Sequence, residues 1–201
     1  KKNFSNFNFK KIPNIMGVLN LTPDSFSDGG KYNNSLGYLH GLKLFNLGAD
    51  IIDVGGESTR PGSKEVKVND EWKRIKFTLK KLKQKKIPIS LDSRKSSIIE
   101  KGIKLKVKLI NDISSLNFDK KTIKIIKKFK IPFVINHIQG NPTNMQKKPK
   151  YKNVLFDIYD YFEEILNDLR YKGVKHQNII IDPGIGFGKN LKHNITLISN
   201  I

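Results

Sequence analysis

Seven polar side chains that could bind a ligand or move a proton stand at the ends of short apolar runs in this sequence. They are Asn20, Asp53, Asp92, Asn111, Asn136, His137 and Asp182. Runs of Ile, Val and Leu are typical of buried parallel strands, and in a barrel of βα units the functional groups lie where each strand ends. The repeated pattern therefore predicts a single site at one end of a sheet.

Asp182, which closes an Ile-rich run, indicates what such a site could bind. A carboxylate in a mostly apolar socket can accept two parallel hydrogen bonds from a planar ring edge that carries an N–C–N donor pair. Pterin and guanine rings both present that edge, and Asp92 and Asn111 would join Asp182 at the same end of the sheet. The alternative for any one of these residues is a helix N-cap, which is a common use of Asp and Asn.

Two polar motifs follow the first two predicted strands. NLTPDSFSDGG at 20–30 combines hydroxyls, carboxylates and a glycine pair, a composition that a surface turn would also explain. GGESTRPGS at 55–63 brings the hydroxyls of Ser58 and Thr59 beside the guanidinium of Arg60. Such a cluster of donors and positive charge suits an anion.

A glycine-rich motif, DPGIGFGK at 182–189, follows the last predicted strand. It differs from the dinucleotide fingerprint and from the Walker pattern, because its glycines alternate and Asn190 stands where the Walker pattern has Ser or Thr. The most informative residue of this motif is therefore Asp182, the carboxylate at its start. His40, His176 and His193 lack the spacing of metal ligands, so the sequence predicts no closed zinc site.

The elements that must position these groups alternate between apolar runs and helix-compatible stretches. The apolar runs lie at 15–19, 51–54, 87–91, 107–110, 131–135 and 178–181. Amphipathic periodicity predicts helices at 70–84, 119–130 and 154–171. Six βα units of this kind predict an α/β fold with a parallel sheet. We expect a TIM-type (β/α)8 barrel that lacks its C-terminal units here, because an open doubly wound sheet usually concentrates its site at one switch point.

Three predicted strand-to-helix loops, at 20–34, 55–69 and 138–152, are much longer than the about two to six residues typical of such joints. Long loops at one end of a barrel indicate lids over a site. In the helix predicted at 154–171, the aromatic side chains include Phe156 and Tyr159. We expect both of these to lie in the core.

Composition and charge limit the class of protein. A chain of 201 residues makes one domain the expected organisation, although a complete barrel usually needs about 250 residues. The net charge of +20 favours a nucleic-acid-binding protein, but only four of the 38 basic residues are Arg, the residue that base and phosphate recognition favours. We therefore interpret the lysines as solvated helix faces and expect no specific nucleic acid partner. Without Cys or a long apolar segment, a cytoplasmic protein with no membrane partner is expected.

Six segments together closely resemble dihydropteroate synthase, a pterin-binding family of folate biosynthesis. They are MGVLNLTPDSFSDGG (16–30), GADIIDVGGESTRPGS (48–63), SLDSRK (90–95), INDIS (110–114), HIQGNPTNMQ (137–146) and IDPGIGFGKN (181–190). The resemblance spans nearly the whole chain, and the first two segments and the last are long and in order. The sequence is thus identified as a member of that family.

The resemblance implies a TIM-barrel transferase that condenses 6-hydroxymethyl-7,8-dihydropterin diphosphate with 4-aminobenzoate. The products are 7,8-dihydropteroate and diphosphate, and the cofactor is Mg2+. By motif position, Asp92, Asn111 and Asp182 would hold the pterin. Asn20 would meet Mg2+ and the diphosphate.

The resemblance also implies a second subsite, for 4-aminobenzoate. Its residues would be Thr59, Arg60, Phe26, Pro61 and Phe187. Asp92, Asp182 and Arg60 would serve catalysis by stabilising separated charge, so that the protein needs no strong nucleophile or base. Closure of the long loops would exclude water, and the matched Lys189 receives no assigned role.

The sequence departs from the family pattern in two places. Asn136 stands where the family commonly has a methionine packed on the pterin. The chain also ends at Ile201, before the family's seventh and eighth strands with their Ser-Arg-Lys and Arg-x-His elements. We therefore expect the 201-residue chain alone to be inactive or nearly so, and a homodimer only for a full-length protein.

Two other functions fit parts of the sequence. One is the pterin-binding domain of a methyltransferase, which would keep the ring-binding residues and pass a methyl group to a corrinoid partner. The other is a noncatalytic basic binding module, which the high lysine content would favour. The TPDSF and STRPGS loops favour the synthase over both.

Overall fold

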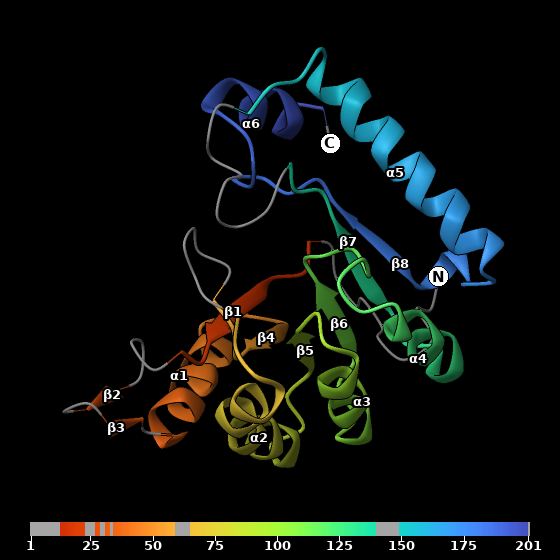
Figure 1. Ribbon diagram of the computed structural model, residues 1–201. Helices are drawn as coiled ribbons and strands as arrows, with labels where there is room; N and C mark the ends of the chain where they lie inside the picture. Colours follow the sequence, from red (N-terminus) through yellow and green to blue (C-terminus); the bar gives the residue numbers. More distant parts are fainter. Residues whose placement is uncertain are drawn as a thin grey trace.

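The computed structural model describes residues 13–22, 27–28, 31–32, 34–58, 65–139 and 149–200. Six strands form one parallel sheet in the order β1-β4-β5-β6-β7-β8 (Figure 1). The strands are β1 (Met16–Asn20), β4 (Ile51–Gly55), β5 (Ile89–Asp92), β6 (Leu109–Asp112), β7 (Phe133–Asn136) and β8 (Ile179–Asp182). Each strand begins within one of the predicted apolar runs, so all six strand predictions are confirmed. Five strands also include the polar residue just beyond the run, whereas Asp53 lies inside the run of β4.

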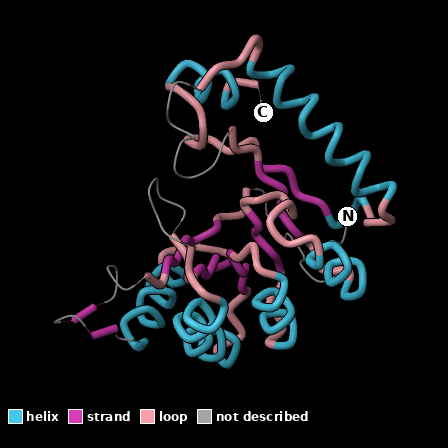
Figure 2. The backbone as a smooth tube through the Cα atoms, viewed as in Figure 1, coloured by secondary structure: helices cyan, strands magenta, loops and turns pink. Residues whose placement is uncertain are grey.

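Helices connect these strands, as the alternation along the backbone in Figure 2 shows. They are α1 (Asn34–Asn46), α2 (Val68–Gln84), α3 (Ser96–Lys104), α4 (Lys121–Phe129), α5 (Val154–Tyr171) and α6 (Leu191–Ile198), with a short 3-10 turn η1 (His176–Asn178) before β8. The predicted helix at 154–171 matches α5 at both ends. Two short strands, β2 (Ser27–Asp28) and β3 (Lys31–Tyr32), form an antiparallel pair within the first predicted loop.

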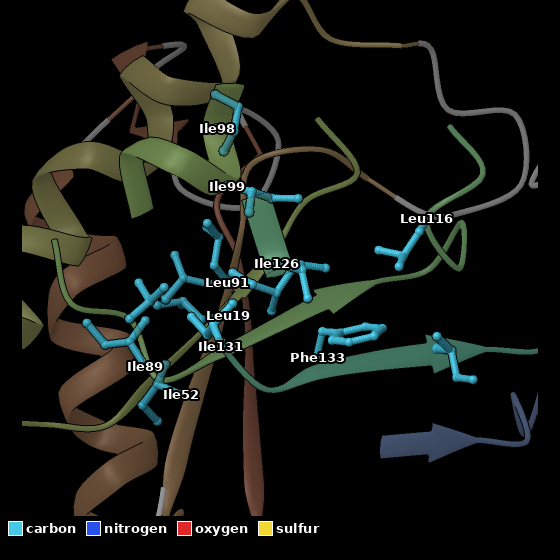
Figure 3. Packing of buried hydrophobic residues seen from close by; sticks show 14 of the residues in the cluster. Leu19, Ile52, Ile89, Leu91, Ile98, Ile99, Leu116, Ile126, Ile131 and Phe133 are labelled. Carbon is cyan, nitrogen blue, oxygen red and sulfur yellow. The ribbon is translucent and has the colours of Figure 1, made fainter. Parts of the chain in front are cut away.

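The larger apolar core lies between the sheet and the helices. One face of each strand supplies aliphatic side chains to it, and the amphipathic faces of the helices supply the rest (Figure 3). Its fully buried members include Leu19, Ile52, Leu91 and Phe133 from strands, Ile98 and Ile99 from α3, and Ile126 from α4. Burying one such side chain stabilises the fold by about 1.5–3 kcal/mol, so this layer fixes the positions of the strand ends.

The other face of the sheet has a separate, smaller apolar cluster. Its members are Met16, Ile51, Leu109, Val134 and Ile180, which come from strands between β1 and β8. None of the helices that the structure describes contributes to this cluster, so the described helices cover one face of the sheet only. A doubly wound sheet carries helices on both faces, whereas a barrel carries them outside. The predicted TIM-type α/β barrel, with six βα units in this chain, is therefore confirmed.

One sequence-based expectation for the core is wrong. Phe156 and Tyr159 of α5 are 67% and 65% exposed. The buried stripe of α5 instead includes Val154, Ile158 and Phe162, which recur every four residues. Because successive side chains on a helix are about 100° apart, Phe156 and Tyr159 lie away from that stripe.

Three helices end with the same unusual backbone feature. Lys86 after α2, Lys106 after α3 and Lys130 after α4 have φ values of 59°, 69° and 51°. This left-handed conformation closes a helix, and glycine adopts it at the lowest cost. Within the described part of the chain, no helix has both the length and the apolar character that crossing a membrane requires.

Candidate active site

Three polar residues and one glycine lie side by side at or next to the ends of the first four sheet strands. Asn20 of β1 pairs in register with Gly55 of β4, Gly55 with Asp92 of β5, and Asp92 with Asn111 of β6. A side-chain carbon at Gly55 would lie 2.9 Å from Oδ2 of Asp92 and 3.3 Å from Oδ1 of Asn20. The side chains of Asn20 and Asp92 therefore converge over this glycine, on the inner face of the barrel.

Asp53 lies one layer deeper in the barrel than Asp92. It stands two residues before the end of β4 rather than at the strand end, and it is 4% exposed. Nδ2 of Asn111 donates a 2.9 Å hydrogen bond to its Oδ2, and its Oδ1 has no hydrogen-bond partner among the described residues. Asn111, the register partner of Asp92, thus connects Asp53 of β4 to the end of β6.

Burial governs the protonation of these two acids. It raises the pKa of Asp53, and it raises that of Asp92 well above the ordinary value, where the nearby charges of Asp53, Asp112 and Glu71 add to the effect. Two carboxyl groups this close resist being ionised together. A ligand that brings N–H donors or positive charge would favour their ionised forms, so the pair is suited to an electron-poor ring.

A second polar group is formed by β7 and β8. Asn136 and Asp182 are register partners, and Nδ2 of Asn136 donates a 2.8 Å hydrogen bond to Oδ2 of Asp182. The backbone N–H of Gly184 donates to the other oxygen of this carboxylate at 2.7 Å. The plane of the Asp182 carboxylate is thus set by one donor from β7 and one from its own loop.

Strand parity places both groups on the inner face. Side chains alternate along a strand, and Ile180 of β8 belongs to the inner apolar cluster, so Asp182 faces inward as well. Leu91 of β5 belongs to the outer core, so Asp92 faces inward. Because β6 and β7 separate β5 from β8, the two acids approach the barrel interior from different sides.

The glycine motif after β8 has a backbone that other residues would strain. Gly184 has φ +70°, and a side-chain carbon there would lie 2.0 Å from the backbone oxygen of His137. This close approach joins the loop to the end of β7. Phe187, two residues before the buried Lys189, is half-buried in the same loop. The alternating glycines therefore serve a tight turn against a neighbouring strand.

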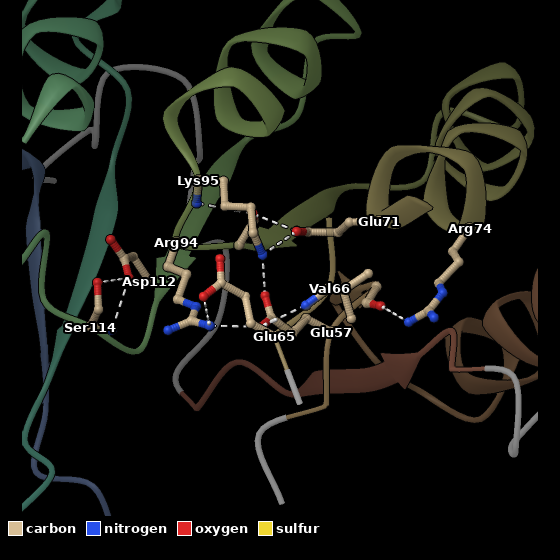
Figure 4. Close-up of polar contacts among 11 residues, drawn as sticks. Glu57, Glu65, Val66, Glu71, Arg74, Arg94, Lys95, Asp112 and Ser114 are labelled. Atoms are coloured by element: carbon tan, nitrogen blue, oxygen red, sulfur yellow. Dashed lines mark hydrogen bonds and ion pairs between the residues drawn. The ribbon is translucent and has the colours of Figure 1, made fainter. Parts of the chain in front are cut away.

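Figure 4 shows a network of charged side chains that includes Glu57, Glu71 and Lys95. Nζ of Lys95 pairs with Glu57 and, at 2.7 Å, with Oε2 of Glu71, which is fully buried. Nη2 of Arg94 contacts Oε1 of Glu57 at 2.7 Å, and Ser93 donates to Glu71 at 2.6 Å. Arg94 and Lys95 hold the pKa of Glu57 below its ordinary value despite the partial burial of that residue. The network ties the ends of β4 and β5 to α2.

The comparisons with known proteins match this architecture. The family model described as "Pterin binding enzyme" matches residues 16–201. The chain belongs to the pterin-binding enzyme family. A curated dihydropteroate synthase from Escherichia coli strain K12 is 40% identical over 191 residues, which cover 94% of this chain and 67% of that protein. One from Clostridium beijerinckii is 41% identical over 197 residues, covering 97% of this chain and 71% of that protein.

Solved structures of this family have the same fold. A crystal structure of Yersinia pestis dihydropteroate synthase with a sulfonamide drug complex gives a TM-score of 0.85 at 38% identity, covering 93% of this chain and 68% of that one. The Xanthomonas albilineans dihydropteroate synthase with 4-aminobenzoic acid gives 0.84 at 33% identity, covering 94% and 67%. The chain thus spans about two thirds of the length of these pterin-binding enzymes.

The residues that the family resemblance singled out are only partly described. Thr59, Arg60, Pro61 and Phe26 lie outside the described residues. Asn20, Asp92 and Asn111 are brought together, whereas Asp182 joins Asn136 instead. In the described ranges no group of three or more His, Cys, Asp or Glu side chains could hold a metal ion.

The N-cap alternative does not explain the strand-end residues of this family member. Side-chain caps are made by Asn153 at α5 and by Asn190 at α6. At α2 and α3 the capping residues are Lys67 and Lys95, whose side chains form no capping bond. The acids and amides at the strand ends are thus not used as caps of these helices, and their side chains are available to a ligand on the inner face of the sheet.

Sequence reasoning missed several residues of the site. Charge did not mark Lys95, Glu57 and Glu71 as buried, because charged side chains are usually exposed and Lys95 lies 38 and 24 residues from these two partners. Asp112 at the end of β6 was also missed, and it accepts hydrogen bonds from the backbone and hydroxyl of Ser114. Glu57, Lys95 and Asp112 all lie inside segments that carry the family resemblance, and that position is the signal that could have found them.

Proposed function

We propose that this protein catalyses the dihydropteroate synthase reaction of folate biosynthesis. In that reaction 4-aminobenzoate displaces diphosphate from 6-hydroxymethyl-7,8-dihydropterin diphosphate. The relatives that carry this name support a transferase of this kind. The observation that carries the proposal is the inner-face row of Asn20, Asp92 and Asn111, with Asp182 facing the same interior.

In the proposed pterin site, Asp182 and Asp92 accept hydrogen bonds from the N–H groups of the ring, and Asn111 adds an amide partner. The carboxylate of Asp182 is already oriented by Asn136 and Gly184, so ligand binding costs little further ordering. Solved relatives include a Xanthomonas albilineans enzyme in complex with 7,8-dihydropteroate, which supports a pterin ligand in this barrel.

Charge separation is the main demand of the reaction. As diphosphate departs, positive charge develops on the pterin methylene and spreads into the ring. Burial raises the pKa of Asp92 and Asp53, and a positive ring beside these acids would favour their ionised forms. The protein would thus act through preorganised negative charge and positioning rather than through a nucleophile.

Mg2+ fits the proposed site as a cation that its substrate brings. Mg2+ is usually held by one or two protein oxygens together with substrate phosphates and water. The exposed amide of Asn20, at the end of β1 and beside Asp92, offers one such oxygen. When bound, Mg2+ would neutralise charge on the departing diphosphate. Thr59, Arg60, Pro61, Phe26 and Phe187 remain our proposed residues for the aminobenzoate.

Calorimetric titration tests the proposal at its first step. The protein should bind 6-hydroxymethyl-7,8-dihydropterin diphosphate in the presence of Mg2+. Adenosine diphosphate, whose ring lacks the paired N–H donor edge, is the control ligand. Equal affinity for the two diphosphates would reject the pterin site.

A further inference from the structure

Lys189 is a buried positive charge that the proposed reaction does not use. It stands at the end of the glycine motif after β8 and is 4% exposed. Its Nζ donates to the backbone oxygens of Gly184 and Phe187, both at 2.9 Å, and contacts the oxygen and Nδ1 of His137 at 3.2 and 3.0 Å. Every polar partner of this ammonium is therefore a backbone oxygen or a ring nitrogen.

The contact between Lys189 and His137 requires a charged lysine and a neutral histidine, and the pKa of each residue agrees with this assignment. An ammonium only donates, so Nδ1 of His137 must accept, and the imidazole must be neutral with its proton on Nε2. Burial and the charge of Lys189 lower the pKa of His137 to about 4, which keeps the ring neutral. Burial lowers the pKa of Lys189 to about 8, against the opposing charge of Asp182, which leaves Lys189 mostly charged at neutral pH.

The contacts of Lys189 join two parts of the site. Its partners Gly184 and Phe187 belong to the loop that begins at Asp182, and its partner His137 directly follows Asn136 at the end of β7. The same loop receives one more bond, from the hydroxyl of Tyr151 to the backbone oxygen of Gly188 at 2.8 Å. Loss of the ammonium would leave three backbone oxygens without this donor.

The amide of Gly184 links Lys189 to the proposed ring-binding carboxylate. The carbonyl of Gly184 accepts from Lys189, while its N–H donates to Oδ1 of Asp182. Gly184 makes both bonds in a left-handed conformation, with φ +70°. A fixed Gly184 therefore fixes one of the two bonds that orient Asp182.

We propose that Lys189 is a positioning residue, a buried ammonium that locks the 183–188 loop to the end of β7 and thereby orients Asp182 and Phe187. Lys189 is not a catalytic residue in this scheme, because its Nζ is surrounded by the protein's own acceptors. The coupling to ligand binding rests on the proposed pterin site. The lock itself depends only on contacts within the chain.

Hydrogen exchange tests the lock without any substrate. Lys189→Met keeps the length of the side chain and removes the donor, and we expect the Gly184 amide to exchange at least about tenfold faster, with strand amides of β5 and β6 unchanged. Lys189→Gln keeps two hydrogen-bond donors without the charge, so its exchange rate at Gly184 should lie between those of the unsubstituted protein and Lys189→Met. It replaces Lys189→Met in the test if that variant does not fold. Lys192→Met, an exposed lysine three residues on, is the matched control.

Binding of the pterin diphosphate tests the coupling. We expect Lys189→Met to weaken binding about tenfold and Lys192→Met to leave it unchanged. Unchanged exchange at Gly184 overturns the lock, and faster exchange with unchanged pterin affinity overturns the coupling. If the unsubstituted protein itself fails to bind the pterin, the proposed function falls, while the exchange experiment still decides the lock.

Discussion

Nδ2 of Asn136 donates a hydrogen bond of 2.8 Å to Oδ2 of Asp182, across the pair that joins β7 to β8. The backbone N–H of Gly184 holds the other oxygen of the same carboxylate. Asp182 therefore faces the barrel interior with its orientation already set by two donors. A ring that donates two further hydrogen bonds meets an acceptor that needs little additional ordering.

Removing this carboxylate should abolish pterin binding. We expect Asp182→Ala to weaken the affinity for the pterin diphosphate by about 100-fold or more, because two charge-assisted hydrogen bonds are lost together. Asp160→Ala, a change at an exposed acid of α5, should leave the affinity unchanged. Calorimetric titration measures both, and an unaltered affinity in Asp182→Ala would refute the role we give this residue.

Asn136, which donates a hydrogen bond to Asp182, should also affect the affinity for the pterin diphosphate. Asn136→Leu removes the 2.8 Å bond at nearly constant volume, and we expect about fivefold weaker pterin binding, since one net hydrogen bond contributes about 1 kcal/mol. Binding that instead becomes tighter would mean that Asn136 competes with the ring for Oδ2. Circular dichroism on the same samples separates this effect from unfolding.

The buried ion network should matter for stability. Lys95→Met leaves Glu71, which is fully buried, without its positive partner, and we expect a loss of about 3–5 kcal/mol in the free energy of unfolding. Lys104→Met removes an exposed pair with Glu100 and should cost at most about 0.5 kcal/mol. Urea unfolding compares the two, and equal losses would show that the network contributes no more than a surface pair.

His137 should give the protein an acid-sensitive stability. Its folded pKa is about 4 against 6.5 for the ordinary group, so the unfolded chain takes up a proton that the folded one refuses. The stabilising contribution is complete above pH 6.5 and is lost progressively as the pH falls toward about 4. His137→Gln should flatten this loss in urea unfolding.

Three buried acids of the sheet act in the opposite direction, because burial raises the pKa of Asp53, Asp92 and Asp112. They remain in both proteins, so the difference between the two profiles reports His137. His176→Gln, at an exposed histidine, should reproduce the original profile. Identical profiles for all three proteins would contradict a neutral buried imidazole.

Replacing Lys130, which follows α4 in a left-handed backbone conformation, with glycine should stabilise the protein. Lys130→Gly relieves a residue at φ 51°, and we expect a gain of about 0.5–1 kcal/mol in stability. Lys124→Gly, the same change in the middle of α4, should instead cost about 1 kcal/mol. Thermal unfolding distinguishes the two, and a loss in both would show that Lys130 makes a contribution beyond its backbone.

The strand pattern was predictable because it depends on local composition. The run at 178–181 became β8, and its closing acid Asp182 faces inward as expected. The helix at 154–171 was also predicted, since its periodicity is carried by neighbouring turns. Its exposed Phe156 was not, because aromatic character alone does not tell which side of a helix is covered.

The contacts within the site were not predictable, because they depend on distant pairs. The partners of Lys95 in Figure 4 come from segments 24 and 38 residues away, and nothing local marks Lys95 as buried among so many solvated lysines. Asn136 was recognised as a departure from the family, but its bond to Asp182 spans 46 residues. Mg2+, the homodimer and the cytoplasmic location stay predictions.

The strand order has a consequence for how the chain is made. Every strand of the six-stranded sheet after β1 pairs with the sheet strand that precedes it in the chain, so no pairing has to wait for a later βα unit. Each strand pairing closes a loop of about one βα unit, so the entropic cost of closing that loop does not grow with the length of the chain. The topology therefore permits pairing in chain order, from the amino-terminal strand onward.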